Sequence, residues 1–328
     1  MRRTRSSLVT TALAVLMAFA ALGVIVSVVA SVYGRRTVAD ATAAVRLRAM
    51  QQTRSNLRLL EAELQTYRLL PVMLGEYTDV RAALASGTVD PALNAKLALL
   101  AARTGAPVIY ALDTQGMTIA ASNADRPDSF LGHDYRYRDY FTKAMASGAT
   151  EFFALGSVSG RPGLYLSRRI DRAGRPLGVV VVKVEFDRIA QAWIQDHMAT
   201  FVVDADGVIL ISSDPRLEFH TTRALSPARR RTLAQTRQFG TLPLLRAPLT
   251  LADDRSRLGD GTPAVTVSLP VPIAGWHLVH MEPLDAALRS AAVRTRSATT
   301  IAALATIAAM LGAWWLHQRR KRNAGARA

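Results

Sequence analysis

Residues 108–122 read VIYALDTQGMTIAAS, an apolar run, a D-x-x-G turn and a second apolar run. The same order returns in FVVDADGVILISS at residues 201–213, and the two turn aspartates lie 91 residues apart. In both copies a serine follows the aspartate by nine positions. Because an aspartate here accepts local backbone hydrogen bonds and a glycine permits a positive φ, each copy predicts a β-hairpin. One D-x-x-G hairpin is common, but two copies with matched flanks predict two similar units in tandem.

Four further runs of apolar and β-branched residues predict additional strands. They cover residues 164–170, 178–186, 264–270 and 275–281. Helical patterns precede the first unit and follow the last strand. Strand-rich units with helices at each end indicate antiparallel sheets of the α+β class.

The segment before the first hairpin has a helical pattern. Residues 37–70 contain no glycine or proline, and apolar residues recur every three or four positions. This spacing predicts a long amphipathic helix. We expect Pro71 to break or kink it, and helical character resumes at residues 80–84 and 92–102.

Two uncharged apolar runs lie near the ends of the chain, at residues 8–33 and 298–316. A helix needs about 20 such residues to cross a bilayer. The first run could instead be a signal peptide cleaved near Ala30, but it exceeds the roughly 7–15 apolar residues of such a signal. The second could be a buried core helix, but Trp314 and Trp315 at its end and the basic residues beyond favour a membrane span.

The charge of the chain gathers at these ends. The formal net charge is +16, from 41 Lys and Arg against 25 Asp and Glu. Residues 1–36 and 294–328 supply twelve of those sixteen charges and contain no acid. This distribution argues against a basic nucleic-acid-binding domain, and the positive-inside rule predicts that both termini are cytoplasmic. We therefore expect a protein that crosses the inner membrane twice, with residues 37–296 exported to the periplasm if the organism is Gram-negative.

Several kinds of chemistry lack support. The absence of cysteine excludes disulfides, thiol nucleophiles and cysteine zinc sites. His277 and His280 would point to opposite faces of a strand, which disfavours a metal site. The run from Asp204 to Gly207 resembles part of a calcium loop but lacks the acidic residue at the loop end. No hydrolase-elbow or P-loop motif is present, so we expect no catalytic residue, metal or cofactor.

The most unusual stretch is residues 132–141, GHDYRYRDYF, with three Tyr and two Arg. Guanidinium groups bind carboxylates, and aromatic rings form rigid walls. A loop of small and hydroxyl-bearing residues is expected at residues 152–160.

Lys183 then interrupts a run of valines, where strand alternation places it on one face with Val179 and Val181. An ammonium on an apolar face needs a partner. Glu185 or Asp139 could pair with it. We favour a second interpretation, in which Lys183 joins Arg138 and Tyr140 in an anion-binding site.

Residues from about 60 to 245 resemble the exported sensor region of the four-carbon dicarboxylate sensor histidine kinases (DctB type). The resemblance implies tandem PAS-like units, the double Cache fold, with the dicarboxylate held in the membrane-distal unit. The matching stretches, in the same order and spacing, are YRLLPVML (67–74), SNADRPDSFLGHDYRYRDYF (122–141), EFFALGSVSGRPGLYLSRRI (151–170), GVVVVKVEFDRIAQAW (178–193) and VVDADGVILISS (202–213).

The resemblance also implies roles for individual residues. One departure stands out, because the family usually reads Arg-Pro-Tyr-Phe where this chain has Asp139 in place of the proline. An acid beside the binding arginine is expected to weaken dicarboxylate affinity or alter ligand choice. By resemblance, Arg138 and Lys183 bind carboxylates, Tyr135, Tyr140 and Tyr165 shape the pocket, and Ser157 or Ser159 add hydroxyls.

Topology and resemblance together predict seven segments. They are a cytoplasmic tail (1–7), a transmembrane helix (8–33), a long signalling helix with a helical connection (34–105), a membrane-distal ligand-binding unit (106–195), a membrane-proximal unit (196–296), a second transmembrane helix (297–316) and a basic cytoplasmic tail (317–328).

The resemblance implies a membrane-bound extracytoplasmic sensor of a small organic acid, the sensory half of a two-component receptor. The family continues into a kinase core, whereas twelve residues follow Leu316 here and none form a kinase motif. We therefore expect a sensor without enzymatic activity, either a sensor-only protein or a piece of a larger receptor.

The expected partners are a small carboxylate, the membrane, a second copy of the chain and a separate kinase or transporter, with no nucleic acid. The alternative is the sensor portion of a chemoreceptor or diguanylate cyclase that binds another small ligand.

Overall fold

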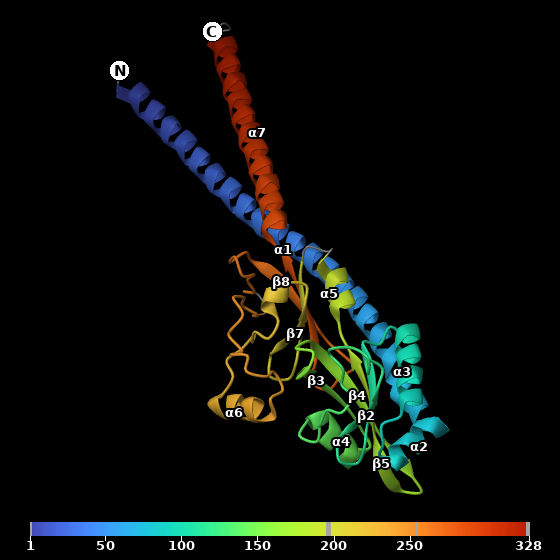
Figure 1. Ribbon diagram of the computed structural model, residues 1–328. Helices are drawn as coiled ribbons and strands as arrows, with labels where there is room; N and C mark the ends of the chain where they lie inside the picture. Colours follow the sequence, from blue (N-terminus) through green and yellow to red (C-terminus); the bar gives the residue numbers. More distant parts are fainter. Residues whose placement is uncertain (1, 195–197, 253–254, 326–328) are drawn as a thin grey trace. The chain divides into compact units, whose positions relative to one another are not determined.

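A computed structural model describes residues 2–194, 198–252 and 255–325 of the protein (Figure 1). The chain divides into two compact units. The helical unit contains residues 1–48, 262–265 and 283–328, and the sheet unit contains residues 49–261 and 266–282. The candidate site lies entirely in the sheet unit.

Helix α1 (Arg2–Glu76) contains the whole amphipathic stretch expected at residues 37–70. Pro71 lies inside α1, so of the expected break or kink the break is not present. The helix continues because Leu74, beyond the proline, is buried in the same apolar core as Leu60 and Leu64. Two short helices come next, α2 (Thr78–Ser86) and α3 (Pro91–Thr104), close to the expected positions.

The first sheet has five antiparallel strands in the order β2-β1-β5-β4-β3. Helix α4 (Asp139–Ser147) packs on one face, and α2 and α3 contact the sheet from the other side. Because both faces are covered, β1 is buried along its whole length and β5 is buried at residues 178–184. The strands are β1 (Val108–Leu112), β2 (Thr118–Ala121), β3 (Ala149–Leu155), β4 (Pro162–Arg172) and β5 (Arg175–Val184).

Strand β3 corrects the loop expected at residues 152–160. Phe152 pairs with Tyr165 and Phe153 with Leu164, so both phenylalanines belong to the sheet. Phe153 is buried in the core, and this burial makes the segment a strand despite the small residues after it. The loop itself contains residues 156–161.

The second sheet has four strands in the order β7-β6-β9-β8. Its residues share one apolar core with the first sheet and with α1, in which Val182, Trp193 and Leu278 are fully buried. The strands are β6 (Ala199–Val203), β7 (Ile209–Ser212), β8 (Ala264–Pro270) and β9 (His277–Pro283), and the connections include α5 (Asp187–Ile194), the 3-10 turn η1 (Pro215–Leu217) and α6 (Pro227–Thr236).

The two hairpins found in the sequence have matching hydrogen bonds. The Oδ1 atom of Asp113 accepts from the amides of residues 115 and 117, and that of Asp204 accepts from residues 206 and 208. The Oγ atom of Ser122 accepts the amide of residue 109 at 2.9 Å, and that of Ser213 accepts the amide of residue 200 at 3.0 Å. The tandem arrangement and the α+β class are therefore confirmed.

In the helical unit, α7 (Asp285–Gly325) contacts α1 through a hydrogen bond of 2.9 Å between the hydroxyls of Thr37 and Thr295. Both helices contain stretches long and apolar enough to cross a membrane. The apolar side chains of these stretches, such as Val24 and Ile301, are exposed, as lipid-facing side chains would be. Figure 1 shows the two long helices, in blue and in red.

Candidate functional site

One face of the first sheet brings together two predicted residues, Tyr165 and Lys183, and adds Phe152 beside them. Phe152 of β3 pairs with Tyr165 of β4, which pairs with Lys183 of β5, so these side chains form one row. Val179 and Val181 share the buried cluster of this face, as strand alternation predicted for the neighbours of Lys183. The remaining side chains of the site come from β1, from α4 and the loop before it, and from the loop at residues 156–161.

Five aromatic rings, the aromatic cluster, cover this face. Tyr140 of α4 stacks on Tyr165 with ring centroids 4.6 Å apart and planes 5° apart. The ring centroid of Tyr135 lies 6.1 Å from that of Tyr140 and 5.8 Å from that of Tyr110 in β1. Tyr110 in turn stacks on Phe130, with ring centroids 5.1 Å apart. The structure thus confirms that the three predicted tyrosines lie together. It adds Tyr110 and Phe130, which the sequence did not single out as site residues.

The tyrosine hydroxyls of this cluster can act as donors. Those of Tyr110 and Tyr135 are buried and have no hydrogen-bond partner among the described residues. Burial raises the pKa of both groups far above its ordinary value, so both stay protonated. A buried hydroxyl without a partner costs free energy, which a ligand acceptor in this place would recover.

Arg138 precedes α4 and is 3% exposed. Its Nη2 atom donates to the carbonyl oxygen of Leu155 at 2.9 Å, and Nη1 donates to that of Arg237 at 3.4 Å. Both acceptors are neutral, and no carboxylate of the described residues lies within 4 Å of the guanidinium. The charge of this buried guanidinium is therefore left for an anion to balance.

Lys183 is fully buried, and its Nζ atom donates to Oγ of Ser159 at 3.0 Å and to Oε1 of Glu185 at 2.6 Å. Glu185 also accepts from Arg161 at 2.8 Å. Burial lowers the pKa of Lys183, and the bond to Glu185 opposes that shift. Of the two pairings that the sequence left open, the Glu185 pairing is therefore present.

Of the other residues that the sequence singled out, some contact Lys183 and some do not. Asp139 pairs with Lys143 at 3.0 Å instead of with Lys183. Ser159 contacts the lysine, whereas Ser157 is exposed in the same turn. Arg161 was missed because an exposed arginine after a glycine gives no sequence signal of a role in a site. The ligand-binding roles of all these residues stay a prediction.

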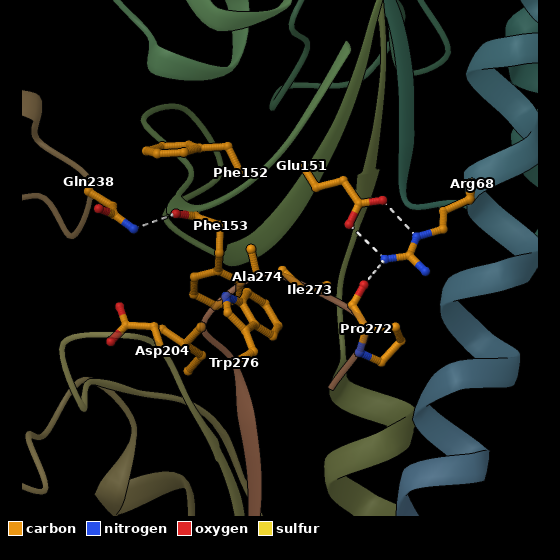
Figure 2. Close-up of a pocket in the computed structure, with 11 residues that line it drawn as sticks. Arg68, Glu151, Phe152, Phe153, Asp204, Gln238, Pro272, Ile273, Ala274 and Trp276 are labelled. Atoms are coloured by element: carbon orange, nitrogen blue, oxygen red, sulfur yellow. Dashed lines mark hydrogen bonds and ion pairs between the residues drawn. The ribbon is translucent and has the colours of Figure 1, made fainter. Parts of the chain in front are cut away.

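A separate cavity of about 440 Å³ lies between β3 and residues 272–276 (Figure 2). Phe153 and Trp276 form its apolar walls, with ring centroids 5.7 Å apart. Two of its charged groups, Arg68 and Glu151, pair with each other at 2.6 Å, and Asp204 also lines it. Figure 2 also shows Gln238, whose amide donates to the carbonyl of Phe153 at 3.0 Å.

Two antiparallel sheets on matched hairpins, with a long helix before them, define a tandem PAS-like sensor fold. The model of the Cache domain family matches residues 41–291, and the chain belongs to this family. The double Cache fold expected from the sequence motifs is thereby confirmed.

Two relatives with known names are also sensor proteins. The chain is 40% identical over 265 residues to the C4-dicarboxylate transport sensor protein DctB of Rhizobium meliloti, covering 77% of this chain and 42% of the relative. It is 37% identical over 188 residues to the Pseudomonas aeruginosa protein of the same name, covering 55% and 31%. The chain thus spans less than half the length of these relatives.

A solved structure shows the same similarity. The sensor domain of the Vibrio cholerae histidine kinase DctB superposes with a TM-score of 0.67 at 27% identity, covering 74% of this chain and 98% of that domain. The recognition of a DctB-type sensor region from sequence motifs is therefore confirmed.

Proposed function

We propose that this chain is the sensory part of a two-component, histidine kinase-type receptor and that it binds a four-carbon dicarboxylate. One observation carries the proposal. Arg138 is a buried cation whose bonds go to two neutral carbonyls, beneath an aromatic cluster with unpaired hydroxyls. A ligand carboxylate would supply the missing charge through paired hydrogen bonds. The names of the relatives support the class of ligand.

The second carboxylate of the ligand is assigned to Lys183. Its ammonium already has Glu185 at 2.6 Å, so the ligand either joins or displaces this internal carboxylate. Tyr135, Tyr140 and Tyr165 enclose the carbon chain, and Ser159, with Ser157 nearby, adds hydroxyls. The site belongs to the proposed membrane-distal unit, residues 106–195, and residues 196–296 form the proposed membrane-proximal unit.

The proposed topology places the sheet unit in the periplasm, between two spans of the inner membrane, with both termini in the cytoplasm. The basic residues at the two ends support this orientation. Pairing of α1 with its copy in a homodimer and transfer of the signal to a kinase complete the proposal.

The test is calorimetry on the full chain in detergent micelles with succinate, malate and fumarate. We expect binding to the wild type and a loss of at least about 30-fold for Arg138→Ala, because removing one partner of a buried charge pair costs on the order of 2–5 kcal/mol. Arg136→Ala is the matched control, since Arg136 is exposed and pairs with Asp134 at 2.7 Å. Absence of binding by all three acids, or full affinity of Arg138→Ala, would contradict the proposal.

A further inference from the structure

The guanidinium of Arg138 also contacts a part of the chain that belongs with the second sheet. Residues Arg237–Gly240, the linking segment, come after α6 and precede β8 in the sequence. The carbonyl of Arg237 accepts from Nη1 of Arg138 at 3.4 Å. The candidate ligand site is therefore in contact with residues outside the first sheet.

The linking segment also bonds to the end of β3. The carbonyl of Gln238 accepts the amide of Leu155 at 2.8 Å, and its side-chain amide donates to the carbonyl of Phe153 at 3.0 Å. Leu155 is the same residue whose carbonyl accepts from Arg138 at 2.9 Å. Arg138, the end of β3 and the linking segment thus form one closed set of hydrogen bonds.

The other side of the linking segment is anchored in the core around the second sheet. Phe239 is 2% exposed and lies edge-on to Phe219 with ring centroids 5.9 Å apart. The amide of Phe219 donates to the carbonyl of Ile209, the first residue of β7, at 2.8 Å. Contacts therefore run without a gap from Arg138 to β7.

We infer that Gln238 is a positioning residue of the ligand site and that the linking segment couples occupancy of Arg138 to the second sheet. The inference rests on the proposed function. A carboxylate bound to Arg138 competes with the carbonyls of Leu155 and Arg237 for the guanidinium donors, so the linking segment shifts when ligand binds. Conversely, Gln238 holds the end of β3 and thereby fixes the direction of Arg138.

A thermodynamic cycle tests this role on the full chain in detergent micelles, titrated with succinate. Gln238→Met keeps the size and the backbone bonds but loses the amide donor, so we expect it to weaken affinity about three- to tenfold. In Arg138→Lys, which loses the guanidinium fork, adding Gln238→Met should cost less than about twofold, because the two residues act together. Gln191→Met, at an exposed position of α5, is the control and should bind like the wild type.

Hydrogen exchange provides a second measurement that needs no variant. Saturating succinate should change exchange in peptides that contain residues 237–245 of the wild type. Full affinity of Gln238→Met, additive losses in the cycle, or unchanged exchange of these peptides would each overturn the inference while the wild type still binds succinate. Failure of the wild type to bind succinate, malate and fumarate would instead refute the proposed function, and the inference with it.

Discussion

Asp204 shows how one residue can shape both a turn and the pH response of the protein. Its Oδ1 atom accepts two backbone amides at 2.8 and 2.9 Å, which closes the second hairpin. Burial raises the pKa of this carboxyl from 3.8 to about 6, even though the two hydrogen bonds act in the opposite direction. The folded protein therefore binds a proton here more tightly than the unfolded chain does.

This tighter proton binding makes the stability of the protein depend on pH. A raised folded pKa stabilises the protein fully below the unfolded value near 4, and this contribution is lost as pH rises through about 6. We expect Asp204→Asn, which keeps an acceptor oxygen but no charge, to be more stable than the wild type at pH 8 by on the order of 2–3 kcal/mol, and therefore to melt at a higher temperature. At pH 4 the two proteins should melt alike.

Thermal unfolding from pH 4 to pH 8 measures this difference. Glu218, whose pKa burial raises to about 7, leaves some pH dependence in both proteins. Parallel curves for the wild type and Asp204→Asn over the whole range would show that Asp204 is not the group responsible.

At this scale the sequence predicted the candidate site well where residue types are unusual for their surroundings. A lysine among valines and two arginines among tyrosines stand out, and the structure places Lys183 and Arg138 on one face with the predicted tyrosines. Tyr110 was missed because a tyrosine in a strand is ordinary. Only tertiary packing reveals that its hydroxyl lacks a partner among the described residues.

At the scale of elements, the two hairpins repeat the same local hydrogen bonds. Ser122 and Ser213 each form two hydrogen bonds to the first strand of their hairpin. The Oγ atom accepts the amide of Ile109 or Thr200, and the amide of the serine donates to the carbonyl of that same residue at 2.8 Å. Each hydroxyl therefore satisfies an amide that the turn would otherwise leave open.

We expect Ser122→Ala and Ser213→Ala each to lower the free energy of unfolding by about 1–3 kcal/mol, because a buried amide loses its acceptor. Ser213 also donates to the carbonyl of Met198 at 2.9 Å, so its replacement should cost more. Denaturant titration gives the values, with Ser55→Ala, at an exposed position of α1, as control. Equal stability of all three variants would mean that the serines do not close the hairpins.

Elements with their own periodicity were predicted closely, and those that depend on neighbours were not. The strand expected at residues 264–270 coincides with β8, because its alternation is local. Strand β3 was taken for a loop, since only pairing with β4 distinguishes it from the glycine-rich turn after it. The extension of α1 beyond Pro71 likewise depends on the burial of Leu74.

On the scale of the whole chain, the first and last helices meet within the helical unit. The hydroxyls of Thr37 and Thr295 are 2.9 Å apart, and a side chain at Gly34 would lie 3.2 Å from Thr295. Small residues at a helix crossing allow such a close approach. This contact joins the beginning and the end of the sequence.

The absence of cysteine makes the contact easy to test. We expect the double variant Thr37→Cys, Thr295→Cys to form an internal disulfide under mild oxidation, because the two hydroxyls already lie within hydrogen-bonding distance. Mass spectrometry of peptides detects the link. Thr42→Cys paired with Thr295→Cys is the control, since Thr42 is one turn and a half away along α1. Linkage of the control pair at equal yield, or none in the test pair, would contradict the contact.

The two hairpins differ most in the length of chain that returns to each turn. After Ser122 the chain takes thirteen residues to return to its turn, where the amide of Tyr135 donates to Gly116, whereas after Ser213 it takes nine to reach the matching bond from Thr222 to Gly207. The longer return contains Phe130 and Tyr135 of the aromatic cluster. Each hairpin is closed by its own aspartate and serine. The sequence of the segment that returns to the turn can therefore change while both hairpins keep these hydrogen bonds. A change in this longer return would therefore alter the proposed ligand site and leave both turns closed.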